Sequence, residues 1–138
     1  MNLLDTVAVG MTAEKKVIVT AEMTVGHVLP GMPLVYGTPT MILHMEIAAT
    51  LAIQPYLPAG HVSVGMMVSV RHLAATPIGR SVRAIARVTG VEEKSVSFEV
   101  EAWDGDRKIG DGTHRRGVVN LAEFEKRSGA RLPEMTGA

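Results

Sequence analysis

The chain has 138 residues with 14 acidic and 14 basic side chains, so its formal net charge is zero, and its length fits one domain spanning residues 1–138. Proteins that bind a nucleic-acid backbone normally carry a basic surplus or a basic stripe, and the absence of both argues against a nucleic-acid partner. The absence of cysteine excludes disulfides, thiolate nucleophiles and cysteine-based zinc sites.

The N-terminal part of the chain predicts one strand followed by a connection. Residues 14–23, EKKVIVTAEM, contain a short β-branched run that is typical of a strand. Gly26 to Gly37 is interrupted by two prolines and a further glycine, and this pattern indicates a loop. The first residues, MNLLDTVAVGM, do not resemble a signal peptide. A cytoplasmic protein is therefore the simplest interpretation.

A long helix is predicted next, from Pro39 to Gln54, where glycine and further proline are absent. Thr38 is a suitable N-cap, and Pro39 suits the first helical position. The helix should end before Pro55, because the residue preceding a proline avoids the α region. Apolar residues fall on nearly every face, so we expect this helix to be buried. Its most apolar part, residues 41–53, is too short to span a bilayer, and we expect no membrane partner.

The rest of the chain predicts mainly strands. Several segments are rich in β-branched residues or alternate apolar and polar side chains, and Asp104-Gly105 is typical of a tight hairpin turn. The expected elements are strands at His61–His72, Ser81–Thr89, Ser95–Trp103 and Lys108–Leu121, and a short helix at Ala122–Arg127. The tail from about residue 128 should be loose. One strand, one buried helix and four antiparallel strands give an α+β fold.

Several spaced residues carry a resemblance to a known family. Thr38 is followed eight residues later by Glu46 and a further 26 residues later by His72. Gly65 lies between Glu46 and His72, and Arg116 lies further on, in the segment IGDGTHRRGVVNLAEF. Over roughly residues 38–124 the sequence resembles the fluoroacetyl-CoA thioesterase family, a branch of the hotdog-fold thioesterases. The resemblance implies a long buried helix wrapped by a curved antiparallel sheet of about five strands. It also implies hydrolysis of an acyl-coenzyme A to a carboxylic acid and free coenzyme A.

The same resemblance implies roles for individual residues. Thr38, Glu46 and His72 match the family's catalytic residues. Gly65 matches a glycine whose backbone N–H faces the thioester oxygen, and Arg116 matches an arginine near the substrate. Members specific for the fluorinated substrate carry a longer, Phe-rich lid before the threonine, whereas this chain has VLPGMPLVYGT, without phenylalanine. The resemblance therefore implies thioester hydrolysis but not fluoroacetyl specificity.

Glu46 is the most informative residue, because it lies in the apolar helical segment MILHMEIAATLAI. Burying an unpaired carboxylate costs several kcal/mol or leads it to take up a proton. A carboxylate in such a place can act as a general base, or as a nucleophile toward a thioester. The structural alternative is a glutamate between two helices of a dimer, paired with an arginine.

The other candidates also have structural alternatives. Thr38 could be only a helix cap. His72 could be a structural histidine, or it could activate water or protonate the leaving thiolate. Gly65 could mark a bulge, or its backbone N–H could be an oxyanion donor. In a regular helix Thr38 and Glu46 lie about 12 Å apart along the axis. Either the helix begins later, or the two residues meet across a dimer interface. We favour a site shared between protomers.

Substrate and partners follow from the same pattern. Tyr36, Met41 and Met45 could line a small apolar pocket, which favours a short acyl chain. Arg116 could bind a substrate phosphate or lie on a solvated strand edge. We expect no metal and no cofactor, because no metal-ligand or dinucleotide motif is present.

A homodimer or higher homo-oligomer is expected, since a single curved sheet leaves an edge and one side of the helix uncovered. Two other functions remain open. One is a non-catalytic acyl-CoA-binding hotdog protein. The other is a hotdog hydratase or dehydratase, although its usual Asp-to-His helix motif is absent.

Overall fold

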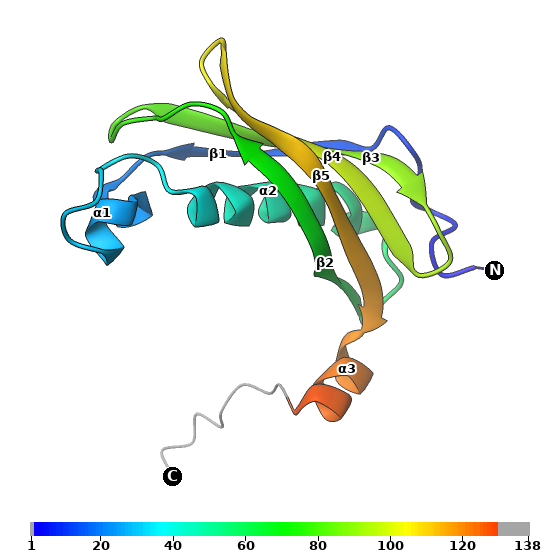
Figure 1. Cartoon of the computed structure of the whole chain (residues 1–138). Coiled ribbons are helices and arrows are strands. Elements are labelled where there is room, and N and C mark those ends of the chain that lie inside the picture. The colour runs from blue at the N-terminus through cyan, green and yellow to red at the C-terminus, as the bar shows by residue number, and fades with distance from the viewer. Residues whose placement is uncertain (1, 130–138) are drawn as a thin grey trace.

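The computed structural model describes residues 2–129. It consists of one antiparallel sheet that curves around a long helix (Figure 1). The strands are β1 (Thr12–Ile18), β2 (His61–His72), β3 (Ser81–Val91), β4 (Ser95–Asp104) and β5 (Arg107–Asn120), in the order β1-β3-β4-β5-β2. The helices are α1 (Val25–Val28), α2 (Thr38–Ile53) and α3 (Leu121–Ser128), with 3₁₀ turns at Ala21–Met23 and Gln54–Tyr56. The expected α+β layout is confirmed.

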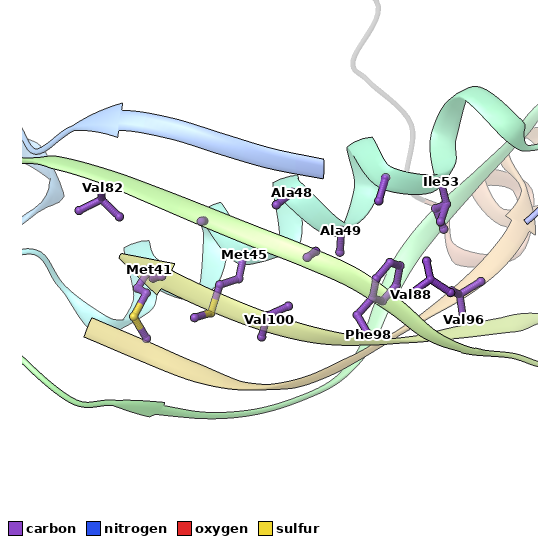
Figure 2. Close-up of a cluster of buried hydrophobic side chains, with 14 of the residues drawn as sticks. Met41, Met45, Ala48, Ala49, Ile53, Val82, Val88, Val96, Phe98 and Val100 are labelled. Carbon is purple, nitrogen blue, oxygen red and sulfur yellow. The ribbon is translucent and has the colours of Figure 1, made fainter. Parts of the chain in front are cut away.

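The core lies between α2 and the concave face of the sheet (Figure 2). One face of α2 is buried because small and flexible apolar side chains recur at helical spacing: Met41, Met45, Ala48, Ala49, Ala52 and Ile53. Alternate residues of β3 and β4 meet this face: Val82, Ala84, Ala86, Val88, Val96, Phe98, Val100 and Ala102. The alternation predicted from sequence is therefore the inner face of the sheet.

The first strand differs from the sequence prediction. It spans Thr12–Ile18 rather than residues 14–23, and the chain leaves the sheet before Ala21. Thr24 explains part of the change, because its hydroxyl accepts a hydrogen bond from the backbone N–H of His27 and caps α1. The connection predicted as a loop thus begins with a short helix.

The start of α2 also differs from the prediction. Gly37 is the N-cap, and Thr38 is the first helical residue with no capping hydrogen bond from its side chain. The backbone supplies the contact instead, since the N–H of Met41 donates to the carbonyl of Gly37 at 2.9 Å. The helix ends at Ile53, before Pro55, as predicted. The Thr38 hydroxyl is therefore available for another partner.

The C-terminal elements agree closely with the prediction. Gly105 has a φ of 59° in the turn that joins β4 to β5, as expected for Asp104-Gly105. The side chain of Asn120 caps α3 by accepting from the N–H of Glu123. Most of the tail expected to be loose lies outside the described residues. Within residues 2–129, no helix is long and apolar enough to cross a membrane.

Phe98 tests the packing of this core, because its side chain is fully buried against the helix side of the sheet. We expect Phe98→Ala to lower the free energy of unfolding by about 3–5 kcal/mol, through lost burial and the cavity left behind. Phe124 on α3 is partly exposed and is the matched control, with an expected loss of about 1 kcal/mol. Urea denaturation measures both. Equal losses would contradict the placement of the core.

Candidate active site

Thr38 and His72 meet at one end of the sheet. Thr38 begins α2 and His72 ends β2, and Oγ1 of the threonine lies 2.7 Å from Nδ1 of the histidine. Burial lowers the pKa of His72, which favours its neutral form. Nε2 of this ring is buried and has no hydrogen-bond partner among the described residues. A hydroxyl next to a neutral imidazole is suited to proton transfer.

A second buried pair lies beside them. Tyr36 donates its hydroxyl hydrogen to Nδ1 of His44 at 2.5 Å, and the two rings stack with centroids 5.7 Å apart. Burial, with a contribution from Lys15, lowers the pKa of His44, while burial raises the pKa of Tyr36. Both groups are therefore neutral at physiological pH. The ring of Tyr36 also packs at right angles to His72, with centroids 6.3 Å apart.

A groove of about 410 Å³ opens next to Thr38 and His72. Most of its wall is apolar and comes from the segment before α2 and from the chain after β2: Val25, Met32, Pro33, Val35, Tyr36, Leu73, Ala74 and Ala75. A larger depression of about 730 Å³ lies against α3 and contains none of the predicted site residues. The smaller groove is therefore the candidate for the acyl site.

Met41 and Met45 do not line this groove. Both side chains are fully buried, because they lie on the face of α2 that packs against the sheet (Figure 2). The interpretation of these methionines as pocket walls is corrected accordingly. Of the three predicted lining residues, Tyr36 alone borders the groove.

Glu46 belongs to a different group of side chains. Its Oε2 lies 3.0 Å from Nη1 of Arg116, and the two side chains are 35% and 7% exposed. The guanidinium also donates from Nε to the hydroxyl of Ser63 at 2.8 Å and from Nη2 to the carbonyl of Ser63 at 2.9 Å. The expectation of a buried, unpaired carboxylate is therefore wrong. Glu46 lies on the flank of α2 that faces the edge strand β2, where the helix is partly open.

Gly65 lies against this carboxylate. A Cβ atom at this position would be 2.6 Å from Oε2 of Glu46, so a larger residue would displace the carboxylate. The pairing of β2 with β5 shifts between Gly65 and Met67, which is the bulge that the sequence left as one possibility. Gly65 is paired with Arg116 across the two strands. Gly65, Glu46 and Arg116 thus form one cluster.

His114 is a member of this cluster that the sequence analysis did not select. It is 1% exposed and stacks on Phe98, with ring centroids 5.9 Å apart. Its Nδ1 lies 2.7 Å from the carbonyl of Met67 and its Nε2 lies 3.2 Å from Nη1 of Arg116. The sequence offered one signal for it, since His114 lies two residues before Arg116 and residues two apart on a strand face the same side of the sheet.

The two groups are separate within one chain. Thr38 and Glu46 lie eight residues apart on an uninterrupted helix, which puts them about 12 Å apart along its axis. Gly65 and His72 lie seven residues apart on β2, a distance of about 23 Å along an extended strand. Since α2 begins at Thr38, a later start of the helix does not bring the groups together.

The described residues contain no group of three or more His, Cys, Asp or Glu side chains that could hold a metal ion.

The chain is similar to proteins of known activity. A family described as fluoroacetyl-CoA-specific thioesterase matches residues 19–122. The fluoroacetyl-CoA thioesterase of Streptantibioticus cattleyicolor is 36% identical over 135 residues, which cover 94% of this chain and 97% of that protein.

Solved structures agree with this similarity. A structure of the fluoroacetyl-CoA thioesterase FlK superposes with a TM-score of 0.85 at 36% identity, over 94% of this chain and 100% of that chain. A thioesterase superfamily member from Thermus thermophilus has a TM-score of 0.83 at 34% identity, with coverage of 91% and 93%. A hot-dog-like protein from Thermanaerovibrio acidaminovorans has a TM-score of 0.84 at 26% identity, with coverage of 97% and 99%. The hotdog fold expected from the sequence is confirmed.

The buried histidines make stability depend on pH. Burial lowers the pKa of His44, His72 and His114 below the ordinary 6.5. As the pH falls below that value, the unfolded chain takes up protons that the folded chain does not, so the free energy of unfolding should fall. Urea denaturation at about pH 7.5 and about pH 5.5 measures this loss.

Two variants separate the contribution of a buried histidine from that of an exposed one. His44→Asn keeps an acceptor for the Tyr36 hydroxyl but cannot titrate, and it should show a smaller loss between the two pH values. His27→Gln, at an exposed position, should retain the wild-type loss. A wild-type free energy of unfolding that did not change with pH would contradict the neutral state of these rings.

Proposed function

The chain belongs to the fluoroacetyl-CoA-specific thioesterase family and is an acyl-CoA thioesterase, and we propose that it acts on short acyl groups at a site completed by a second copy of the chain. The observation that carries the proposal is the hydrogen bond between Thr38 and His72 beside an apolar groove. Variants of FlK have been studied in complex with fluoroacetate and CoA, and with acetyl-CoA. Those small acyl groups match a groove of this size.

The proposed chemistry uses both clusters. The oxygen of a water molecule bonds to the thioester carbonyl carbon while the carboxylate of Glu46 takes one of its protons. The C–S bond then breaks and coenzyme A leaves as the thiolate. Nε2 of His72, which has no hydrogen-bond partner among the described residues, accepts the proton from Glu46 and then passes it to the sulfur of the thiolate. Thr38 holds the ring in place through Nδ1.

Arg116 and Gly65 act on the carboxylate in this scheme. The guanidinium orients Glu46 by the contact at Oε2, and the missing side chain of Gly65 leaves room for the carboxylate against β2. The bulge interrupts the regular pairing of β2 with β5 next to Gly65, which supports the role of its backbone N–H as an oxyanion donor.

A homodimer supplies the missing half of each site. β2 lies at the edge of the sheet and exposes Met66, Met67 and Val68, while α2 exposes Leu43 and Leu51. Unpaired strand edges and apolar surfaces favour association with another chain. A two-fold axis beside β2 places the partner's β2 and α2 antiparallel to the same elements of the first copy. The Thr38–His72 end of one copy then lies next to the Glu46 cluster of the other.

A short acyl chain and a cytoplasmic location complete the proposal. The groove is bounded by the short segment between α1 and α2, which contributes Met32, Pro33 and Val35 to the wall. This segment has little surface with which to enclose a long alkyl chain.

Release of free thiol from a panel of acyl-CoA thioesters tests the activity and the chain length. We expect acetyl-, propionyl- and butyryl-CoA to give higher kcat/KM values than palmitoyl-CoA, because the groove is small. Binding of these esters without release of thiol would support a non-catalytic acyl-CoA-binding protein. A preference for palmitoyl-CoA would contradict the assignment of the groove.

Complementation between inactive variants tests the shared site. Glu46→Gln and Thr38→Ala should each lower turnover, Glu46→Gln by about 10²- to 10⁴-fold. A heterodimer of the two, co-expressed with different affinity tags, contains one site with both defects and one site with neither. Its turnover should therefore recover to about half of the wild-type value.

The matched control combines two defects in the same cluster. A heterodimer of Thr38→Ala with His72→Asn carries one defect in each site, and its turnover should stay low. No recovery in the first heterodimer would show that each site is built within one chain. Recovery in this control would show that the Thr38 and His72 of one site come from different chains. Failure to isolate any heterodimer would contradict the dimer itself.

A further inference from the structure

His114 is held in one protonation state by its two neighbours. Nδ1 lies 2.7 Å from the backbone carbonyl of Met67. A carbonyl can only accept a hydrogen bond, so Nδ1 carries the hydrogen. Nε2 lies 3.2 Å from Nη1 of Arg116, and a guanidinium can only donate, so Nε2 must be the acceptor. Both contacts are satisfied together by the neutral ring with its hydrogen on Nδ1 and by no other form.

The surroundings of the ring favour this neutral form. His114 is 1% exposed, and its ring stacks on Phe98 of β4. The charged groups that face it are Arg116 on β5 and Glu46 on α2, while β2 contributes the Met67 carbonyl. Burial and the arginine lower the pKa of His114, and the carbonyl and the carboxylate oppose that shift without cancelling it.

His114 therefore connects two features of the proposed site. On one side it holds the carbonyl of Met67, which closes the bulge that begins at Gly65. On the other side it shares Nη1 of Arg116 with Oε2 of Glu46, at 3.2 and 3.0 Å. Nε and Nη2 of the guanidinium donate to Ser63, so Nη1 is the group whose direction His114 can set.

We propose that His114 is a positioning residue, whose neutral ring aims Nη1 of Arg116 at Glu46 and fixes the bulge at Gly65. The inference rests on the proposed role of Glu46 in thioester hydrolysis. A proton on Nε2 would point at an N–H of Arg116 and remove the acceptor, so the guanidinium would turn away from the carboxylate. The substrate is not touched by His114, and the effect of a substitution should therefore appear in kcat more than in KM.

Two substitutions separate the two contacts of the ring. The side-chain amide of Gln can place its carbonyl oxygen near the position of Nε2, which keeps an acceptor for Arg116. The shorter amide of Asn can place its N–H₂ near the position of Nδ1, which keeps the donor to Met67 but leaves Arg116 without this acceptor. We expect His114→Asn to lower kcat by about 10- to 100-fold with KM nearly unchanged, because a misplaced catalytic group costs about this much. His114→Gln should retain a kcat within a few-fold of wild type.

Thermal unfolding of both variants provides the structural comparison. Each variant loses one buried hydrogen bond, so a merely structural residue would give similar losses of stability and equal kcat values per folded molecule. Equal kcat values for Asn and Gln would overturn the positioning role. Wild-type kcat in His114→Asn, when Glu46→Gln is inactive, would do the same.

¹⁵N NMR of the histidine side chains tests the inference without relying on catalysis. In the unsubstituted protein, His114 should show a protonated Nδ1 and an unprotonated Nε2, and it should remain neutral at pH values near the ordinary histidine pKa of about 6.5. A hydrogen on Nε2, or protonation of both nitrogens at about that pH, would overturn the proposal. If Glu46→Gln retained full turnover, the proposed function would fail while the NMR result would still decide the state of His114.

Discussion

Helix α2 is an uninterrupted rod of 16 residues, and its apolar face is pressed against the concave side of the sheet. This packing fixes both the position and the rotation of the helix, because Met41 and Met45 must point into the core (Figure 2). Once the helix is fixed, Thr38 and Glu46 cannot approach each other. The rigidity of one element thus divides the polar residues of one chain into two groups, which the proposed dimer would bring together.

The polar groups are accommodated in this apolar setting by complementary hydrogen bonding. A buried guanidinium is costly unless its donors are satisfied, and Arg116 meets this requirement with Ser63, His114 and the carboxylate of Glu46. The histidines of both groups are neutral, since burial lowers the pKa of each ring. The charge of the site is therefore carried by one ion pair, and the rings serve as oriented donors and acceptors.

The similarity to FlK connects this arrangement with thioester hydrolysis. The similarity extends over nearly all of both chains, and the shared fold places the long helix and the edge strand in the same relation. The segment before α2 contains no phenylalanine, and it forms a wall of the groove beside Thr38 and His72. In the proposed function this segment would set the preferred acyl group without changing the polar residues of the candidate site.

Local patterns in the sequence determined most of the secondary structure. Alternation in β3 and β4, the turn at Asp104-Gly105 and the stop before Pro55 are short-range effects, and each appears where it was predicted. The first strand was misplaced, since its predicted end at residues 21–23 forms a 3₁₀ turn, where the hydroxyl of Thr24 donates to the carbonyl of Ala21. Spacing on a regular helix predicted that Thr38 and Glu46 are far apart, but only the observed start of α2 at Thr38 removed the alternative of a helix that begins later.

Only the tertiary structure decided which side chains are neighbours. The cap position was assigned to Thr38, but the fold gives it to Gly37 and turns the threonine toward His72, a residue 34 positions away. The sequence left open whether the carboxylate of Glu46 is unpaired or paired with an arginine, and the fold pairs it with Arg116, which also contacts His114. Such contacts depend on how strands far apart in the chain are aligned, and a bulge at Gly65 changes that alignment by one residue. Local propensity contains no information about this register, which is why the sequence selected candidate residues but not their partners.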